Sequence, residues 1–476
     1  MTIRTDARHE SSYTTAYADF ARRHPGYAAG GRLDQARERD FGRLDRSGDV
    51  YLDYTGAGLY AESHVEAHTK LLTSRVFGNP HSTNPTSAAT TALAESARRA
   101  VLAHFRADPA EYVVVFSTNA SGALKLVAES YPFGPDGTFL LSYDNHNSVN
   151  GIREYARGRG ARVVYAPVRP PDLRLDDEAL RRALDEPSLG APRLFAFPAQ
   201  SNFSGVLHPQ HWVARAHERG WHVLLDCAAY APTHALDLAA VKPDFVSLSF
   251  YKMFGYPTGV GALLARRAAL AALRRPWFAG GTISYASVTE PRHDLVEGAE
   301  AFEDGTINYL ALPAVEAGLQ RMAHGHLAAI HARVTSLTAW TLEQFGALRH
   351  PNGNPVVVVY GPTDTRGRGA TIAFNLIDDA GRLVDLRDVE QRANAERISL
   401  RTGCFCNPGV GELALGITAA DLARCFATTD RMTIDTFRSC LADTGIGAVR
   451  VSFGEASTFA DAHALLRLLG TFRVGS

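Results

Sequence analysis

The chain has 476 residues, 46% of them hydrophobic, with 49 Lys and Arg against 50 Asp and Glu and a formal net charge of −1 at pH 7. This length predicts two or three domains with a sizeable core, and the near-neutral charge argues against nucleic acid or an acidic membrane surface as partner. The sequence has no apolar run long enough to span a membrane and no signal-peptide core. We therefore expect a cytoplasmic protein whose five cysteines are free thiols, not a disulfide framework.

Three sections follow one another along the chain. Residues 1–49 are rich in Arg, Asp and Glu and are predicted to form an N-terminal arm with a short helix or two. Residues 50–345 alternate short apolar runs with helical patterns such as Ala88–Phe105 and Asp177–Leu184, which predicts a mostly parallel sheet covered on both faces. Several runs lack polar alternation, as buried strands do. The runs are Tyr112–Phe116, Thr138–Leu141, Val163–Tyr165, Leu194–Phe197, His222–Leu225, Phe245–Ser249 and Val260–Leu264.

The pattern changes near residue 350, where Pro351–Pro355 is a cluster of turn-forming residues. Residues 346–476 mix strand and helix patterns and are predicted to form a smaller α+β domain. The expected strands are Val356–Tyr360, Thr371–Asn375, Ile398–Arg401 and Val449–Ser452, and the expected helices are Asp385–Ala395 and Ala460–Leu469.

Two residues at the ends of apolar runs suggest cofactor chemistry. Asp226 ends the run His222–Leu225, and ligands of open α/β sheets bind beyond the carboxyl ends of strands. A carboxylate there suits the protonated ring nitrogen of pyridoxal phosphate (PLP), although a helix N-cap is the commoner role for a lone Asp. Lys252 follows the next run in a small and aromatic loop, and a desolvated lysine suits Schiff-base chemistry. A lone lysine is more often solvated surface.

Three more loops follow apolar runs and each has two interpretations. Phe116–Gly122 is a hydroxyl-rich turn that opens a helix, which is typical of phosphate binding but also of ordinary N-caps. His146 is a candidate for stacking on a cofactor ring, with a hydrogen-bonded loop histidine as the alternative. Asn202 is a candidate partner of the cofactor's phenolic oxygen, with a turn as the alternative.

The segment Arg401–Gly409 carries Cys404 and Cys406 in a loop bracketed by glycine and proline. A Cys-x-Cys pair is half of a zinc site, but the sequence offers no second pair or Cys/His cluster to complete it, so we expect no metal. The preferred interpretation is a mobile loop with a reactive thiol.

Taken together, these segments resemble the class V aminotransferase-like PLP enzymes of the cysteine desulfurase branch, and most of all the N-terminal domain of molybdenum cofactor sulfurases. The resemblance covers roughly residues 50 to 470. It implies an α/β protein of the PLP-dependent transferase fold type I, with a seven-stranded sheet in the large domain, and a homodimer. The matching segments include Tyr51–Tyr60, Phe77–Ser82, Ser121–Ala128, Asp144–Tyr155, Ser201–Val206, Leu224–Ala229, Ser249–Gly261, Glu303–Asn308, Arg401–Gly409 and Val449–Gly454.

The resemblance also implies a role for each matching residue. Lys252 forms the Schiff base and moves protons, Asp226 pairs with the ring nitrogen, and His146 or its neighbour Asn145 stacks on the ring. Cys406 accepts the sulfur. The other implied contacts are Asn202 with the phenolic oxygen, Thr118, Asn119, Ala120 and Ser249 with the phosphate, Thr306 with the phosphate of a neighbouring subunit, Arg450 assisted by Arg401 with the substrate carboxylate, and Asn79 and His81 with the substrate entrance.

The chain departs from the family pattern at three positions. Ala229 stands where the commoner desulfurases have glutamine, and Tyr251 precedes the lysine where many have histidine. Gly411 stands where the molybdenum cofactor sulfurases carry a further cysteine. We also expect no counterpart of their second domain, which handles the molybdenum cofactor. We therefore expect a separate sulfur acceptor.

The resemblance implies an L-cysteine desulfurase or C–S lyase that forms a persulfide on Cys406 and releases alanine. The alternative is a non-desulfurase class V PLP enzyme of secondary metabolism, such as a lyase, an epimerase or a selenocysteine lyase-like enzyme, in which Cys406 has no part. A third hypothesis, a non-catalytic scaffold for sulfur transfer, is disfavoured by the presence of Lys252, Asp226 and Arg450.

Overall fold

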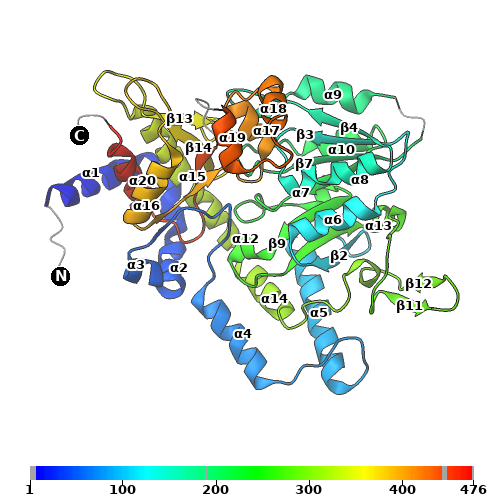
Figure 1. Cartoon of the computed structure of the whole chain (residues 1–476). Coiled ribbons are helices and arrows are strands. Elements are labelled where there is room, and N and C mark those ends of the chain that lie inside the picture. Colours follow the sequence, from blue (N-terminus) through cyan, green and yellow to red (C-terminus); the bar gives the residue numbers. More distant parts are fainter. Residues whose placement is uncertain (1–6, 188–189, 442–446, 474–476) are drawn as a thin grey trace.

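The computed structural model describes residues 7–187, 190–441 and 447–473. Its large sheet, with β3, β7 and β9 labelled in Figure 1, has the strand order β2-β10-β9-β8-β7-β3-β4. β10 is antiparallel to both neighbours and the other pairs are parallel, so the expected mostly parallel seven-stranded sheet is confirmed. The strands are β2 (Tyr112–Ser117), β3 (Thr138–Ser142), β4 (Arg162–Ala166), β7 (Arg193–Pro198), β8 (His222–Asp226), β9 (Phe245–Ser249) and β10 (Gly261–Arg266).

Apolar side chains of this sheet enter a core on each face. Val113 and Val115 belong to one cluster, and Val114 and Phe116 belong to the other. Both sides of β2 are therefore buried, which explains why its sequence is an apolar run without polar alternation. The helices of this part are α4 (Glu62–Ser74), α5 (Pro85–His104), α6 (Ala120–Ser130), α7 (Asn147–Asn150), α8 (Ile152–Gly158), α9 (Asp177–Asp185), α10 (His211–His217), α11 (Leu238–Val241), α12 (Phe250–Phe254), α13 (Arg267–Ala272) and α14 (Leu312–Arg321).

A second core surrounds a four-stranded antiparallel sheet of order β13-β14-β17-β16. The strands of this sheet are β13 (Val357–Tyr360), β14 (Thr371–Leu376), β16 (Arg401–Gly403) and β17 (Ala448–Ser452), and the helices that enter this core are α15 (His324–Ala347), α16 (Leu386–Ala395) and α20 (Phe459–Gly470). The remaining helices of this part of the chain are α17 (Pro408–Ala414), α18 (Ala419–Phe426) and α19 (Ile434–Leu441). Among the described helices, none is long and apolar enough to cross a membrane. Two small antiparallel pairs lie outside these sheets: β5 (Val168–Arg169) pairs with β6 (Arg174–Leu175), and β11 (Ile283–Ala286) pairs with β12 (His293–Leu295).

The N-terminal residues are more helical than their weak pattern indicated. They form α1 (Ala7–Arg23), the 3-10 helix Pro25–Gly30, α2 (Gly31–Phe41) and α3 (Arg43–Ser47). Phe20 and Leu33 are fully buried in the same core as β14 and β17, and β1 (Val50–Tyr51) pairs in parallel with β15 (Ile398–Ser399). Tertiary packing of a few apolar side chains therefore stabilises helices that local propensity does not predict.

The expectation of five free thiols is wrong for two of them. Cys425 on α18 and Cys440 on α19 form a disulfide, with their Cα atoms 5.7 Å apart. These helices contact each other, and this Cα separation lies within the range that a disulfide spans. Cys227, Cys404 and Cys406 are free. Cysteine count and spacing could not reveal the pair, because pairing depends on how the two helices pack.

Candidate active site

Lys252 projects into a pocket at the carboxyl ends of β7, β8 and β9. It lies on the short helix α12, directly after β9. Gly255 ends this helix with φ of 77°, and a Cβ there would lie 2.3 Å from the backbone of Leu59, so only glycine lets the two segments approach. The described residues that line the pocket are Asn119, Ala120, Ser121, Leu124, His146, Ser148, Pro198, Gln200, Asn202, Asp226, Ala228, Ala229, Ser249, Tyr251 and Lys252.

Electrostatics in the pocket favour an uncharged lysine. Burial lowers the pKa of the Lys252 amine below its ordinary value, while the carboxylate of Asp226 opposes that shift. Asp226 ends β8, is 8% exposed, and accepts hydrogen bonds from Ser247 Oγ at 2.8 Å and from the backbone N–H of Ala228 at 3.0 Å. Its carboxylate is thus held in one orientation at the pocket, as a partner for a ring nitrogen requires.

The start of α6 forms one wall of the same pocket. Asn119 is the N-cap, and its Oδ1 accepts from the N–H of Gly122 at 3.0 Å. The N–H of Ala120 donates to Ser249 Oγ at 2.8 Å, which joins this helix end to β9. Backbone N–H groups and the helix dipole at such an end favour an anionic group.

His146, and not Asn145, faces the pocket. Asn145 is fully buried and donates from Nδ2 to Ser142 O at 2.8 Å and to Ala196 O at 3.2 Å. His146 lines the pocket, and its Nδ1 accepts from the N–H of Ser148 at 3.1 Å. Burial lowers the pKa of His146, so the imidazole is neutral, as a ring that stacks on a positively charged heterocycle should be.

Two arginines expected at the substrate carboxylate share one partner that the sequence analysis did not single out. Arg401 and Arg450 are directly opposite on β16 and β17. Arg450 donates to Asp53 Oδ1 at 2.9 Å, and Arg401 donates to Asp53 Oδ2 from Nη2 at 2.7 Å and from Nε at 2.9 Å. Burial lowers the pKa of Arg450, and the Asp53 carboxylate opposes that shift. Asp53 lay inside a matching segment, but a lone Asp after a short strand gave no sign of this contact.

The loop that carries Cys406 is tied to the pocket by three amides. Asn202 Nδ2 donates to Phe405 O at 2.7 Å, and the N–H of Asn147 donates to Cys406 O at 2.7 Å. Asn407 is fully buried and donates from Nδ2 to Asp144 O at 2.7 Å and to Asn202 Oδ1 at 2.9 Å. The sequence analysis missed Asn407, whose place beside two cysteines was the available signal.

Cys404 and Cys406 are both exposed, and the backbone between them is unusual. Phe405 and Cys406 have φ values of 53° and 55°, a left-handed conformation that costs energy for residues with side chains. The phenyl ring of Phe405 lies under the Arg450 guanidinium, with the guanidinium carbon 4.7 Å from the ring centroid. We expected a mobile loop with a reactive thiol; the structure ties its peptide to the pocket by hydrogen bonds and leaves both cysteines exposed.

Besides Arg401, Cys406 and Arg450, four expected site residues lie outside the set of described residues that line the pocket: Asn79, His81, Thr118 and Thr306. All four are exposed. The His81 ring lies against Gly281, where a Cβ would be 2.9 Å from the ring, so the Asn79–His81 turn contacts the segment that leads into β11. Within the described residues, no group of three or more His, Cys, Asp or Glu side chains is arranged to hold a metal.

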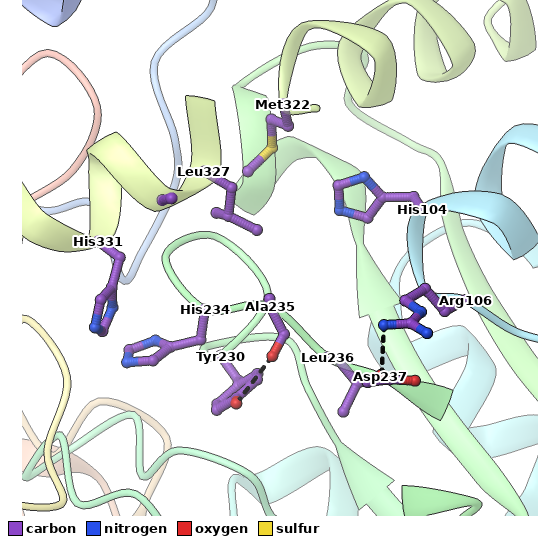
Figure 2. A pocket seen from close by; sticks show the side chains of 11 residues that line it. His104, Arg106, Tyr230, His234, Ala235, Leu236, Asp237, Met322, Leu327 and His331 are labelled. Atoms are coloured by element: carbon purple, nitrogen blue, oxygen red, sulfur yellow. Dashed lines mark hydrogen bonds and ion pairs between the residues drawn. The ribbon is translucent and has the colours of Figure 1, made fainter. Parts of the chain in front are cut away.

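A larger cavity of about 420 Å³ lies apart from Lys252 (Figure 2). Its walls come from the end of α5, the loop 230–237 and the start of α15, and Leu236, Met322 and Leu327 contribute apolar surface. Arg106 and Asp237 form an ion pair at 3.0 Å beside it. Burial lowers the pKa of His234 to about 4, so this side chain is neutral. None of the expected site residues lines this cavity.

Comparison with known proteins gives the family. The class-V aminotransferase family model matches residues 50–465.

The chain belongs to the class-V aminotransferase family.

Members of this family are typically PLP-dependent. The chain is also 38% identical over 476 residues to a molybdenum cofactor sulfurase of Bos taurus, a match that covers 95% of this chain and 53% of the relative. It is 37% identical to a molybdenum cofactor sulfurase of Arabidopsis thaliana, a match that covers 92% of this chain and 58% of the relative. The chain thus spans about half the length of these curated relatives.

A solved structure confirms the expected fold of this chain. The cysteine desulfurase of Thermococcus onnurineus NA1, in its apo form, superposes with a TM-score of 0.77 at 23% identity, covering 93% of this chain and 98% of that one. The expected α/β architecture of PLP-dependent transferases is therefore confirmed, as is the resemblance to molybdenum cofactor sulfurases.

Proposed function

We propose that the chain is a PLP-dependent cysteine desulfurase that takes sulfur from L-cysteine and releases alanine. The bonding of the Cys406 loop to Asn202 and Asn147, at the rim of the Lys252 pocket, carries this proposal. These hydrogen bonds support the proposal because they tie the peptide that carries Cys406 to the region of Lys252, Asp226 and Arg450, whose side chains suit amino-acid chemistry.

PLP fits this pocket by the chemistry of the residues that surround it. Asp226 would face the ring nitrogen, His146 would cover the ring, and Lys252 would hold the aldehyde carbon. The N-terminus of α6, with Asn119, Ala120, Thr118 and Ser249, would hold the phosphate. When bound, PLP supplies an electron sink for charge that develops on the α-carbon of an amino acid.

The residues of the chain supply the remaining steps. Arg450 orients the substrate carboxylate. The Lys252 amine, whose pKa is lowered by burial, takes the proton from the α-carbon and later returns a proton to the alanine product. The Cys406 thiolate attacks the substrate sulfur, so an S–S bond forms on Cys406 as the carbon–sulfur bond breaks, and the bonding electron pair stays with the carbon. A thiol or other separate acceptor then takes the outer sulfur.

The same site also supports a second candidate, a C–S lyase that releases sulfur without Cys406. The observation that favours it is that Cys406 is exposed and is not among the described residues that line the pocket. An epimerase or a selenocysteine lyase-like activity would use the same Lys252 and Asp226.

One experiment separates these functions. Purified Cys406→Ser protein loaded with PLP should keep its yellow absorbance and lose most sulfide and alanine release from L-cysteine, because a hydroxyl cannot accept the sulfur. Cys404→Ser is the matched control and should keep most activity. Wild-type sulfide release without alanine from Cys406→Ser would transfer the proposal to the lyase, and absence of both products from the wild type would reject both.

We also propose that the protein is a homodimer that shares its active sites. Thr306 is exposed and lies outside the pocket of its own chain. Trp277, Phe278 and Tyr285 are 41%, 42% and 58% exposed in the segment around Gly280, which Gly305 approaches, and large exposed apolar side chains are typical of an interface. Light scattering should give twice the mass of one chain, and Thr306→Ala should weaken PLP retention. A fully active monomer would contradict the proposal.

A further inference from the structure

Asp53 accepts a hydrogen bond from Arg450, the arginine that the proposed function assigns to the substrate carboxylate. Its side chain is 11% exposed and joins Arg450 on one oxygen and Arg401 on the other. The three groups carry two positive charges and one negative charge. The site is therefore one positive charge in excess, which matches one monoanionic carboxylate.

Two of the five N–H groups of the Arg450 guanidinium already have acceptors in the protein. Nη2 donates to Asp53 at 2.9 Å and Nη1 donates to Asn202 O at 3.0 Å. Nε is buried and has no hydrogen-bond partner, and the Phe405 ring covers one face of the group. A substrate carboxylate that binds Arg450 side-on, through the parallel N–H groups of Nε and Nη2, therefore displaces Asp53 from Nη2.

Arg401 is placed to hold Asp53 when that happens. It donates two N–H groups to Asp53 Oδ2, the oxygen that Arg450 does not use, and its side chain is 53% exposed. Asp53 thus keeps an ionic partner after Arg450 turns to the substrate. Without Arg401, displacement would leave a nearly buried carboxylate unpaired, which costs free energy.

We propose that Asp53 is an internal competitor that sets the affinity for the substrate carboxylate, and that Arg401 is a positioning residue that acts through Asp53. The inference rests on the proposed function only in assigning the carboxylate to Arg450. It replaces direct assistance by Arg401, which the resemblance implies, with an indirect role. The simpler explanation is that Asp53 only neutralises two arginines that oppose each other on neighbouring strands.

Binding of L-alanine to the PLP-loaded protein tests the proposal, because alanine carries the carboxylate but has no sulfur to lose. Affinity is measured from the change in cofactor absorbance. Asp53→Asn should tighten alanine binding by about tenfold, and Arg401→Gln should weaken it by about tenfold, at the low end of the contribution of a charge-assisted hydrogen bond. Arg401→Lys, which keeps the charge, should recover most of the affinity.

Two controls make the test specific. L-alaninamide lacks the carboxylate, so its affinity should be the same in all variants, whereas a loss of packing would weaken both ligands. The double variant Asp53→Asn/Arg401→Gln should bind alanine as tightly as Asp53→Asn alone, because Arg401 acts only through Asp53.

Three results would overturn the inference. They are weaker alanine binding in Asp53→Asn, a further loss in the double variant, and an absence of alanine binding in both the wild type and Asp53→Asn. If Asp53→Asn fails to fold by circular dichroism, equal affinities in Arg401→Gln and wild type would overturn it. Sulfide release from L-cysteine, measured separately, decides the proposed function whatever the alanine result.

Discussion

The Lys252 pocket and the Cys406 loop differ in how their reactive groups are held. Lys252 and Asp226 follow strands that are buried on both faces, so the large sheet fixes their positions. Cys406 lies in an exposed, left-handed loop, held by hydrogen bonds from Asn202 and Asn147 and by the buried Asn407 next to it. The buried sheet therefore holds the lysine in place, whereas a few amide hydrogen bonds hold the peptide that carries the thiol. The two regions should therefore respond differently to substitution.

The largest expected effect comes from the pocket. Lys252→Ala should lower sulfide release by about a thousandfold, within the range of general acid–base groups, and borohydride should no longer attach PLP to this position. The fold should survive, because the change removes an amine and not core contacts. Lys242→Ala is the matched control, since Lys242 is exposed and pairs with Glu111. Activity measurements and mass spectrometry check both points, and an active Lys252→Ala protein would contradict the pocket assignment.

The second prediction uses pH to distinguish the buried Lys252 from the exposed lysines. Lys252 has a lowered pKa because it is desolvated, so its amine loses its proton at a lower pH than a lysine of ordinary pKa. Lys70, Lys125 and Lys242 are exposed and serve as internal references, and PLP fixation at Lys252 should persist to a lower pH than fixation at these references. Borohydride trapping of PLP on the apoprotein across a pH series, with peptide mapping, should show Lys252 labelled alone at the low end. Equal labelling of all four would contradict the prediction.

The third prediction concerns a substitution that should loosen the Cys406 loop and leave the Lys252 pocket unchanged. Asn407→Ala removes two hydrogen bonds, worth about 2 kcal/mol together, so sulfide release should fall about thirtyfold if the loop position limits the reaction. PLP absorbance should be unchanged. Hydrogen exchange at the Asn147 amide, which donates to Cys406 O, should accelerate.

Asn394→Ala, at an exposed position of α16, is the matched control for Asn407→Ala and should change neither measurement. Unchanged exchange at Asn147 in Asn407→Ala would show that Asn407 does not hold the loop.

The smallest expected effect comes from a change beside the loop. A Cβ at Gly411 would lie 3.6 Å from Cys404 Cβ and 3.5 Å from its sulfur, which is disulfide geometry. Gly411→Cys should therefore form an oxidisable pair with Cys404, detectable by thiol counting in denaturant, and change sulfide release by no more than about fivefold, a free-energy change of about one hydrogen bond. Gly411→Ser is the control. Oxidation should leave two free thiols, Cys227 and Cys406, and four free thiols after oxidation would reject the geometry.

The sequence by itself determined the strands and the residues at their ends. Apolar runs marked all seven strands of the large sheet within one or two residues, and Asp226 and Lys252 could be predicted because a residue that ends a buried strand is carried to the ligand edge of the sheet. Such positions depend on local pattern and on a general rule of α/β topology.

Only the tertiary structure decided the contacts that join distant segments. Asp53 lies 348 residues from Arg401 and 397 from Arg450, and Asn407 reaches Asn202 across 205 residues. The Cys425–Cys440 disulfide belongs to the same class, because its partners meet only when α18 packs on α19. Ion pairs, amide bonds and disulfides form between whichever groups the folded chain brings within a few ångströms, and residue type and spacing along one sequence do not carry that proximity.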